Sequence, residues 1–175
     1  MEAARRGDRA AFDALVRRKV ESVLRTTRTI LGNDADAQDA TQEAFFAAWR
    51  HLPRLRDVDK FEAWFGRILV NACRQSIRRR GVVREIAMPD DPADRHFLAR
   101  DMADPGSSVI DAMSFDRAFE RLSIDDRAVL TLHHADGRGL DDVAVILGIP
   151  TGTVKSRLLR ARRALERSLD RERPR

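Results

Sequence analysis

Apolar residues spaced three, four and seven positions apart recur along most of the 175-residue chain, and this spacing restricts the fold to helices. It places side chains on one face of an α-helix, whereas a β-strand needs an alternation of period two, which the chain lacks. In the first half the pattern predicts three helices: the first ends at Gly32-Asn33, the second stops near Pro53 and the third starts near Asp59. Either Asn33 or Asp34 can cap the second helix. Their apolar faces consist of Phe12, Leu15, Val16, Val23 and Ile30, of Ala37, Thr41, Ala44, Phe45, Ala48 and Trp49, and of Phe61, Trp64, Phe65, Ile68 and Ala72.

The periodic pattern stops at residue 81 and resumes at residue 108. Proline, glycine and acidic residues fill the interval 81–107, which predicts a flexible acidic linker. Beyond it, Ser123 can cap a helix. A glycine-rich turn then leads to a short helix at residues 140–147, which a Gly-Ile-Pro break ends. A long helix follows from Thr151, and Thr151 or Thr153 can cap it. A short helix, a tight turn and a longer helix are typical of a helix-turn-helix. We therefore expect an all-α fold of two small helical domains, residues 1–80 and 108–175. The further apolar positions are Phe115, Ala118, Phe119, Leu122, Ala128, Val129 and Leu132.

Charge is concentrated in blocks. Residues 67–84 carry six basic and no acidic side chains, residues 85–116 have a net charge of −6, and residues 148–175 have a net charge of +6. All but three of the 33 basic residues are arginine. GC-rich codon usage explains a high total of arginine but not this alternation. Two basic surfaces joined by an acidic segment indicate two contacts with a polyanion.

Within each basic block the cations fall on one side of the predicted helix. In the last helix, Ser156, Arg160, Arg163 and Arg167 lie opposite an apolar stripe from Val154 to Leu165, with Lys155 and Arg157 beside them. In the third helix, Arg67, Asn71, Arg74 and Arg78 have the same spacing. These side chains can meet phosphates and base edges, although an ordinary solvated helix face remains an alternative.

Enzyme and membrane functions find no support in the sequence. Cys73 is the only cysteine, so an internal disulfide and a cysteine-based zinc site are excluded, and we expect a buried, inert thiol. The adjacent pairs Asp125-Asp126, Asp141-Asp142 and His133-His134 diverge by about 100° on a helix and cannot converge on one metal ion. The chain has no apolar run of about 18 residues and its N-terminus lacks the apolar core of a signal peptide. We expect a cytoplasmic protein that is not an enzyme and uses no metal, cofactor or small-molecule substrate.

Three stretches together resemble a bacterial sigma factor of the extracytoplasmic-function group. DAQDATQEAFFAAWRHL (36–52) is similar to the segment that grips core RNA polymerase, and FEAWFGRILVNACRQSIRRR (61–80) to the part that melts and reads the −10 promoter element. The stretch from Leu122 to Leu165 resembles the helix-turn-helix domain that reads the −35 element. Gly139 departs from the Ser or Thr that usually caps the short helix, and the absence of tyrosine leaves base stacking to Phe or Trp.

The resemblance implies a set of partners and residues. Core RNA polymerase, promoter DNA and an anti-sigma factor are the expected partners, with no insertion of this chain into a membrane. The implied sites are Thr151, Thr153, Lys155, Ser156, Arg157, Arg160 and Arg163 for the −35 element, Trp64, Arg67, Asn71, Arg74 and Arg78 for the −10 element, and Asp34, Gln38, Asp39, Gln42, Glu43 and Phe46 for the polymerase. The alternative is a stand-alone helix-turn-helix regulator, which would dimerise and carry an effector domain.

Overall fold

The computed structural model describes residues 1–86 and 109–172, with side chains described for residues 1–80 and 113–171. Every regular element in this part of the chain is helical. None of the helices within the described ranges has the length and apolar character needed to cross a bilayer. The elements are α1 (Glu2–Arg5), α2 (Arg9–Leu31), α3 (Asp34–His51), η1 (Leu52–Arg54), η2 (Val58–Lys60), α4 (Phe61–Ile86), α6 (Val109–Glu120), α7 (Ile124–Leu130), η4 (Thr131–Ala135), α8 (Leu140–Leu147) and α9 (Thr151–Glu172).

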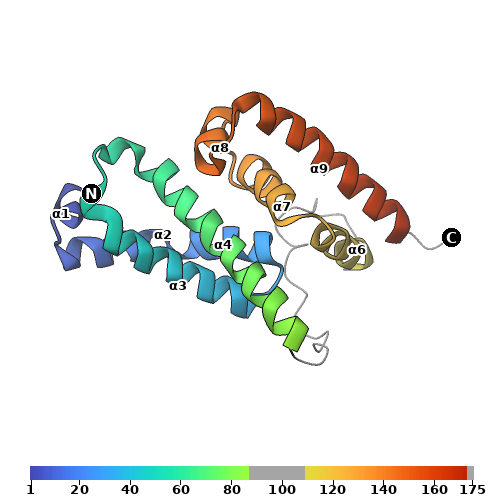
Figure 1. Cartoon of the computed structure of the whole chain (residues 1–175), viewed down its shortest axis with the longest axis horizontal. Coiled ribbons are helices and arrows are strands. Elements are labelled where there is room, and N and C mark those ends of the chain that lie inside the picture. The colour runs from blue at the N-terminus through green and yellow to red at the C-terminus, as the bar shows by residue number, and fades with distance from the viewer. Residues whose placement is uncertain (87–108, 173–175) are drawn as a thin grey trace.

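Helices α2, α3 and α4 form the N-terminal bundle (Figure 1). The predicted apolar faces meet in its interior, where the Phe45 ring lies 5.1 Å from the Phe65 ring, centroid to centroid, and Ile30 has no exposed surface. Asn33 caps α3 by accepting a hydrogen bond from the amide of Asp36, as the sequence predicted. Gly32, at φ 71°, ends α2 in the left-handed conformation that glycine tolerates best.

The C-terminal domain contains α6, α7, α8 and α9. Its core includes Phe119, Val129 and Val154, which are all at most 1% exposed. Ser123 caps α7 through a hydrogen bond from the amide of Asp126, which confirms the prediction. The predicted helix-turn-helix is also present, because α8 ends at the left-handed Gly148 (φ 68°) and α9 follows after Pro150.

One local prediction was wrong. Neither Thr151 nor Thr153 caps α9, because the carbonyl oxygen of Pro150 already accepts hydrogen bonds from the amides of Thr153 (2.9 Å) and Val154 (3.1 Å). Thr151 is therefore the first residue of the helix and Pro150 is its N-cap. The Thr151 hydroxyl donates instead to Asp141 Oδ1, at 2.8 Å. Helix α4 continues to Ile86, six residues beyond residue 80.

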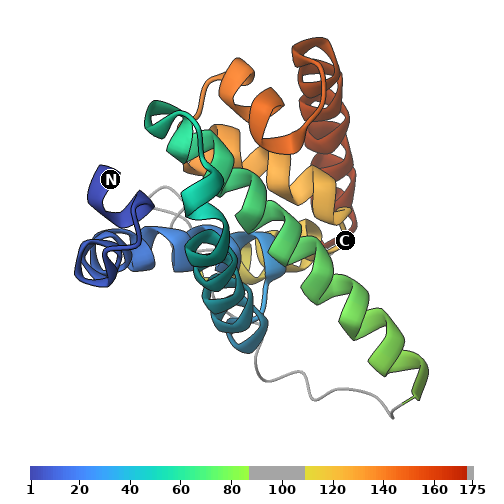
Figure 2. The same cartoon turned by 60° about the vertical axis from the view of Figure 1, so that its left-hand side comes forward.

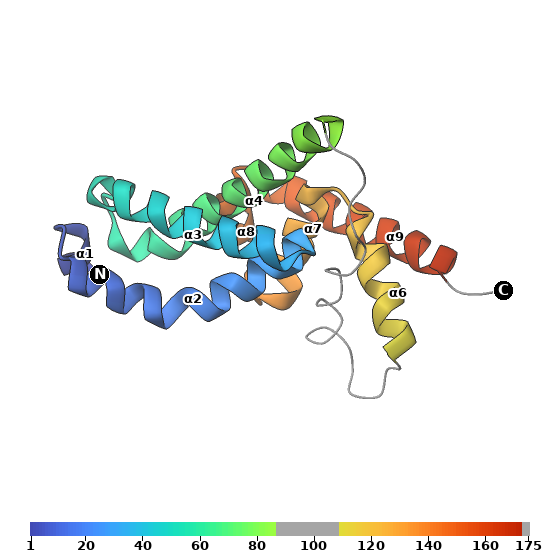
Figure 3. The same ribbon diagram turned by 90° about the horizontal axis from the view of Figure 1, so that it is seen from below.

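The two domains pack against each other. Helix α4 contacts α7 and α8, while α2 contacts α7 and η4. Figures 1 and 2 show α7 lying between α4 and α9, and Figure 3 shows the N-terminal helices on one side of the molecule and α6 and α9 on the other. Most of the predicted flexible linker, residues 87–107, lies outside the described residues.

Candidate nucleic-acid interface

Helix α9 is divided into a buried apolar side and an exposed basic side. Val154, Leu158 and Ala161 are buried, as the spacing predicted. The amphipathic pattern alone therefore fixed which side of this helix faces the domain core. Of the candidate −35 residues, Thr153, Lys155, Ser156, Arg160 and Arg163 are exposed, and Thr151 and Arg157 are half-buried.

Acidic residues at the start of α7 hold two of the α9 arginines. Arg160 Nη2 donates to Asp126 Oδ1 at 3.0 Å, and the side chain of Arg160 keeps 63% of its surface exposed. Arg157 Nη1 lies 3.3 Å from Asp125 Oδ2 and is only 19% exposed. The side chain of Arg160 can therefore contact DNA from its present position, whereas Arg157 would have to lose part of its packing to do so.

The candidate −10 residues lie along α4, on the side that the C-terminal domain partly covers. Arg74 Nε donates to Asp125 Oδ1 at 2.9 Å, and Arg74 Nη1 donates to Asn71 Oδ1 at 3.0 Å. Arg67 and Arg78 are exposed. Trp64 is half-buried against the Phe61 ring, 5.7 Å between centroids, so that part of the indole remains available for stacking.

The candidate polymerase-binding residues share one face of α3. Phe46 is 62% exposed, and the guanidinium carbon of Arg50 lies 5.9 Å from the centre of its ring. Gln38, Asp39 and Gln42 are exposed as well. The other two acids of this set have partners, because Asp34 pairs with Arg28 (2.7 Å) and Glu43 with Arg79 (2.6 Å).

Two buried groups differ in how well the sequence anticipated them. Burial raises the pKa of the Cys73 thiol to about 12, so the expectation of a buried, inert cysteine is confirmed. Arg127 was not singled out by the sequence, yet it is only 7% exposed, and burial lowers the pKa of its guanidinium while the charge of Glu120 opposes that shift. A local pattern could not find it, because its partner is the carbonyl oxygen of Leu31, 96 positions away and 3.4 Å from Nη1.

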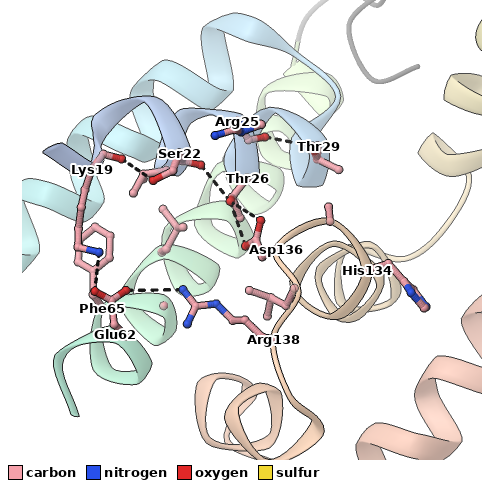
Figure 4. A pocket seen from close by; sticks show the side chains of 15 residues that line it. Lys19, Ser22, Arg25, Thr26, Thr29, Glu62, Phe65, His134, Asp136 and Arg138 are labelled. Atoms are coloured by element: carbon pink, nitrogen blue, oxygen red, sulfur yellow. Dashed lines mark hydrogen bonds and ion pairs between the residues drawn. The ribbon is translucent and has the colours of Figure 1, made fainter. Parts of the chain in front are cut away.

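A cavity of about 780 Å³ lies between α2, α4 and η4, and no sequence pattern indicates it (Figure 4). On its wall the Thr26 hydroxyl donates to Asp136, 3.0 Å from Oδ1, which joins the two domains. Glu62 faces both Lys19 and Arg138 across the same space. Although the Asp136 residue as a whole is exposed, its carboxyl group is partly desolvated, which raises the pKa of Asp136 against the opposing hydrogen bond from Thr26.

The geometry defines a two-domain helical protein with two basic helices and an acidic face on α3 that exposes Phe46. The sigma-70 region 2 family model matches residues 15–82, and the sigma-70 region 4 model matches residues 112–165. This chain belongs to the sigma-70 family, in its extracytoplasmic-function group, and is a promoter-recognising transcription initiation factor, not an enzyme. The alternative of a stand-alone regulator is not favoured, because region 2 occupies the first half.

Similar proteins cover nearly the whole chain. The extracytoplasmic-function sigma factor SigM of Mycobacterium tuberculosis is 36% identical over 163 residues, which span 93% of this chain and 79% of SigM. The RNA polymerase sigma-H factor of Pseudomonas aeruginosa is 31% identical, over 97% of this chain and 91% of its own length.

Two solved structures resemble the fold. The sigma factor RpoE in complex with the anti-sigma factor NepR from Bartonella quintana has a TM-score of 0.70 at 26% identity and covers 93% of this chain and 99% of its own. CnrH in complex with the cytosolic domain of CnrY has a TM-score of 0.69 at 28% identity and covers 98% and 96%.

Proposed function

We propose that α9 reads the −35 promoter element and that α4 reads the −10 element. The observation that carries this assignment is that each helix has one apolar face against its own domain and an opposite polar face, which carries cations and hydroxyl groups on α9 and cations and amides on α4. Arginine forks suit guanine edges and phosphates, and amides suit adenine. The proposed contacts are Thr151, Thr153, Lys155, Ser156, Arg157, Arg160 and Arg163 on α9, and Trp64, Arg67, Asn71, Arg74 and Arg78 on α4.

We propose that α3 binds core RNA polymerase. Phe46 supports this role, because a large aromatic side chain that is 62% exposed beside acidic and amide groups fits a partner surface with basic and apolar groups. The proposed contacts are Asp34, Gln38, Asp39, Gln42, Glu43 and Phe46. Because RNA polymerase works in the bacterial cytoplasm, we place this chain there.

We further propose domain limits of 1–80 and 108–175 and an anti-sigma factor as regulator. Both structural relatives are complexes with a partner protein, named in one case as an anti-sigma factor, NepR, and in the other as the cytosolic domain of CnrY. Their likeness over nearly the entire chain supports a partner of that kind for this protein.

Reconstitution with core RNA polymerase tests the proposal. The purified chain is mixed with core polymerase, and transcription is run on a library of genomic DNA fragments. We expect initiation at a small set of sites that share two sequence elements upstream of the start. Operator binding by the chain alone, with no affinity for core polymerase, would contradict the proposal and favour a stand-alone regulator.

A further inference from the structure

We infer that His134 and Arg162 form a site for a DNA phosphate beside α9, and that this site holds the phosphate more tightly when His134 is protonated. Neither residue is among the contacts proposed above. The inference rests on the proposed function, because it requires α9 to lie against duplex DNA. It adds a ligand group, a phosphate of the DNA backbone, and a condition, the protonation of one histidine.

The contact between the two side chains requires a neutral imidazole. Arg162 Nε donates to His134 Nε2 at 3.2 Å, and Arg162 Nη2 lies 2.8 Å from the same nitrogen. A guanidinium group can only donate hydrogen bonds, so both contacts require a lone pair on Nε2. His134 is therefore uncharged in this structure and carries its single ring proton on Nδ1.

The immediate surroundings favour this neutral form in the free protein. Burial lowers the pKa of His134, and the charges of Arg162 and His133 lower it further. The His133 ring lies 4.8 Å from that of His134, centroid to centroid, and its Nδ1 lies 2.9 Å from the carbonyl oxygen of Arg138. Both histidines belong to η4, a π-helical turn, and such turns are rare and frequent at functional sites.

The other charged groups near His134 already have partners. They line the cavity beside η4, where Asp136 accepts from Thr26 and where Glu62 faces both Lys19 and Arg138. Arg25 of α2 completes the charged wall, to which α7 and α8 contribute no charged side chain. Figure 4 shows the His134 ring pointing away from the Thr26–Asp136 pair. On α9, Glu166 is the one charged residue three or four positions from Arg162.

Arg162 differs from two other arginines of α9 in what holds it. Arg157 and Arg160 are paired with Asp125 and Asp126, so a phosphate has to displace a carboxylate from each. Arg162 is exposed, and in the described part of the chain its printed partner is the neutral imidazole. A phosphate can therefore approach Arg162 without replacing a negative charge.

The position of Arg162 on α9 suits a phosphate better than a base. Seven residues separate Arg162 from Lys155, which places both side chains on the same side of the helix. This side is a flank of the polar face, next to the exposed Ser156 and Arg163. Helices in the major groove meet base edges with the centre of the exposed face and the DNA backbone with its flanks.

Protonation of His134 converts the pair into an anion site. A proton on Nε2 turns that nitrogen from an acceptor into a donor, so it can no longer accept from Arg162. Two positive charges are then adjacent, and a phosphate oxygen between them can accept from both. The bound phosphate stabilises the imidazolium, so the pKa of His134 is higher in the DNA complex than in the free protein. DNA binding therefore takes up a proton, and affinity rises as the pH falls from the pKa of the complex toward that of the free protein.

Binding of duplex DNA at two pH values tests the inference in the full chain. The probe is a fluorescent pool of random-sequence duplex DNA, because a phosphate contact needs no particular sequence. His134→Gln retains a neutral acceptor for Arg162 but cannot be protonated. His51→Gln is the matched control, since His51 is also exposed and lies at the end of α3, in the other domain.

Between about pH 8 and about pH 5.5, we expect the affinity of the parent protein for the pool to rise about three- to tenfold more than that of His134→Gln. His51→Gln should follow the parent protein. At the lower pH, the salt dependence of parent binding should exceed that of His134→Gln by about one ion. The same pH dependence in the parent and in His134→Gln would overturn this inference alone. Absence of duplex binding by the parent at both pH values would overturn the proposed function as well.

An NMR titration of the His134 ring tests the pairing directly. Its signal is identified by its loss in His134→Gln. Arg162→Gln removes a charge that lowers the pKa of His134, so this pKa should rise in the free variant. Addition of the duplex pool to the parent protein should raise it too, because the phosphate stabilises the imidazolium. A pKa that falls or stays constant when DNA is added would overturn the inference.

Discussion

Helices α4 and α9 have comparable sequences of cations above an apolar stripe, but their surroundings in the structure differ. Helix α4 meets Asp125, Ile146 and Gly148 of the other domain, whereas the ion pairs of Arg157 and Arg160 on α9 are with residues of its own domain. The amphipathic pattern of a helix thus reports that one side is buried, but not whether the other side is free. Each prediction below changes one part of this contrast.

Removing the support of α9 should have the largest effect. Phe119 of α6 is 1% exposed in the core of the C-terminal domain. Phe119→Ala should reduce the free energy of unfolding of this domain by about 3–5 kcal/mol, through lost burial and the cavity left behind. Chemical denaturation should show an early transition for the C-terminal domain and a later one for α2–α4. One transition at the wild-type midpoint would mean that α9 does not depend on this core.

Overpacking the contact between α4 and α8 should separate the domains and leave α9 unchanged. Gly66→Leu places a branched side chain against Ile146, and such overpacking should cost the closed arrangement about 1–3 kcal/mol. The expected measurement is a slower disulfide cross-link between cysteines introduced in place of Thr26 and Asp136, and a larger radius of gyration in solution scattering. Because Gly66 has no charge, Gly66→Leu changes the packing between the domains without changing the ion pair between Arg74 and Asp125. A cross-linking rate equal to that of the parent would show that α4 and α8 yield locally instead.

Two arginines at different positions on α9 should separate base reading from phosphate contact. Arg160→Ala should change which −35 sequences are used and cost about 1–3 kcal/mol on the best one. Arg167→Ala should weaken all sequences alike and reduce the salt dependence of binding by about one ion. Promoter selection from a randomised −35 library and binding titrations over a range of salt measure both.

Arg160→Lys is the control for the structural role of Arg160. It can keep a charge near Asp126, which is 8% exposed, while losing the planar fork. If Arg160→Lys changes promoter preference as Arg160→Ala does, but keeps the thermal stability that Arg160→Ala loses, the base contact is supported. If Arg160→Ala and Arg167→Ala both leave promoter use and salt dependence unchanged, the polar face of α9 is only solvated.

Reversing charge on α3 should affect polymerase binding and neither DNA helix. Asp39→Arg with Glu43→Arg should raise the dissociation constant for core polymerase tenfold or more, about 1.4 kcal/mol or above. Because Glu43 also pairs with Arg79, Arg79→Ala is needed as a control for loss of that contact alone. Unchanged affinity in the double variant would show that this face does not contact the polymerase.

Local sequence patterns predicted the helices and their buried sides well. Val154, Leu158 and Ala161 are buried as predicted, and Asn33 and Ser123 occupy the N-cap positions expected for α3 and α7. These features depend on residues a few positions apart, where backbone geometry fixes which side chains can meet. The wrong cap for α9 is also a local matter. The carbonyl oxygen of Pro150 accepts the first hydrogen bonds of the helix, so Pro150 occupies the N-cap position where a threonine was expected.

The sequence could not predict the contacts between the domains. In the sequence, Asp125 at the start of α7 is only one half of an adjacent acidic pair, yet its partner Arg74 lies 51 positions away. Arg127 carries no local sign of burial either, because the groups around it come from α2 and α4. Periodicity contains no information on partners at such a separation, and a charged residue is read as solvated unless its partner is known.

Because α4 and α7 belong to the same polypeptide, closing of the two domains is a unimolecular equilibrium. The fraction of closed molecules is therefore independent of how much of the protein a cell contains, and dilution does not open it. Only a partner that binds the open form more tightly shifts the balance, and its apparent affinity is reduced by the open fraction. The concentration of such a partner, and not the concentration of this protein, therefore determines how many molecules have their two domains apart.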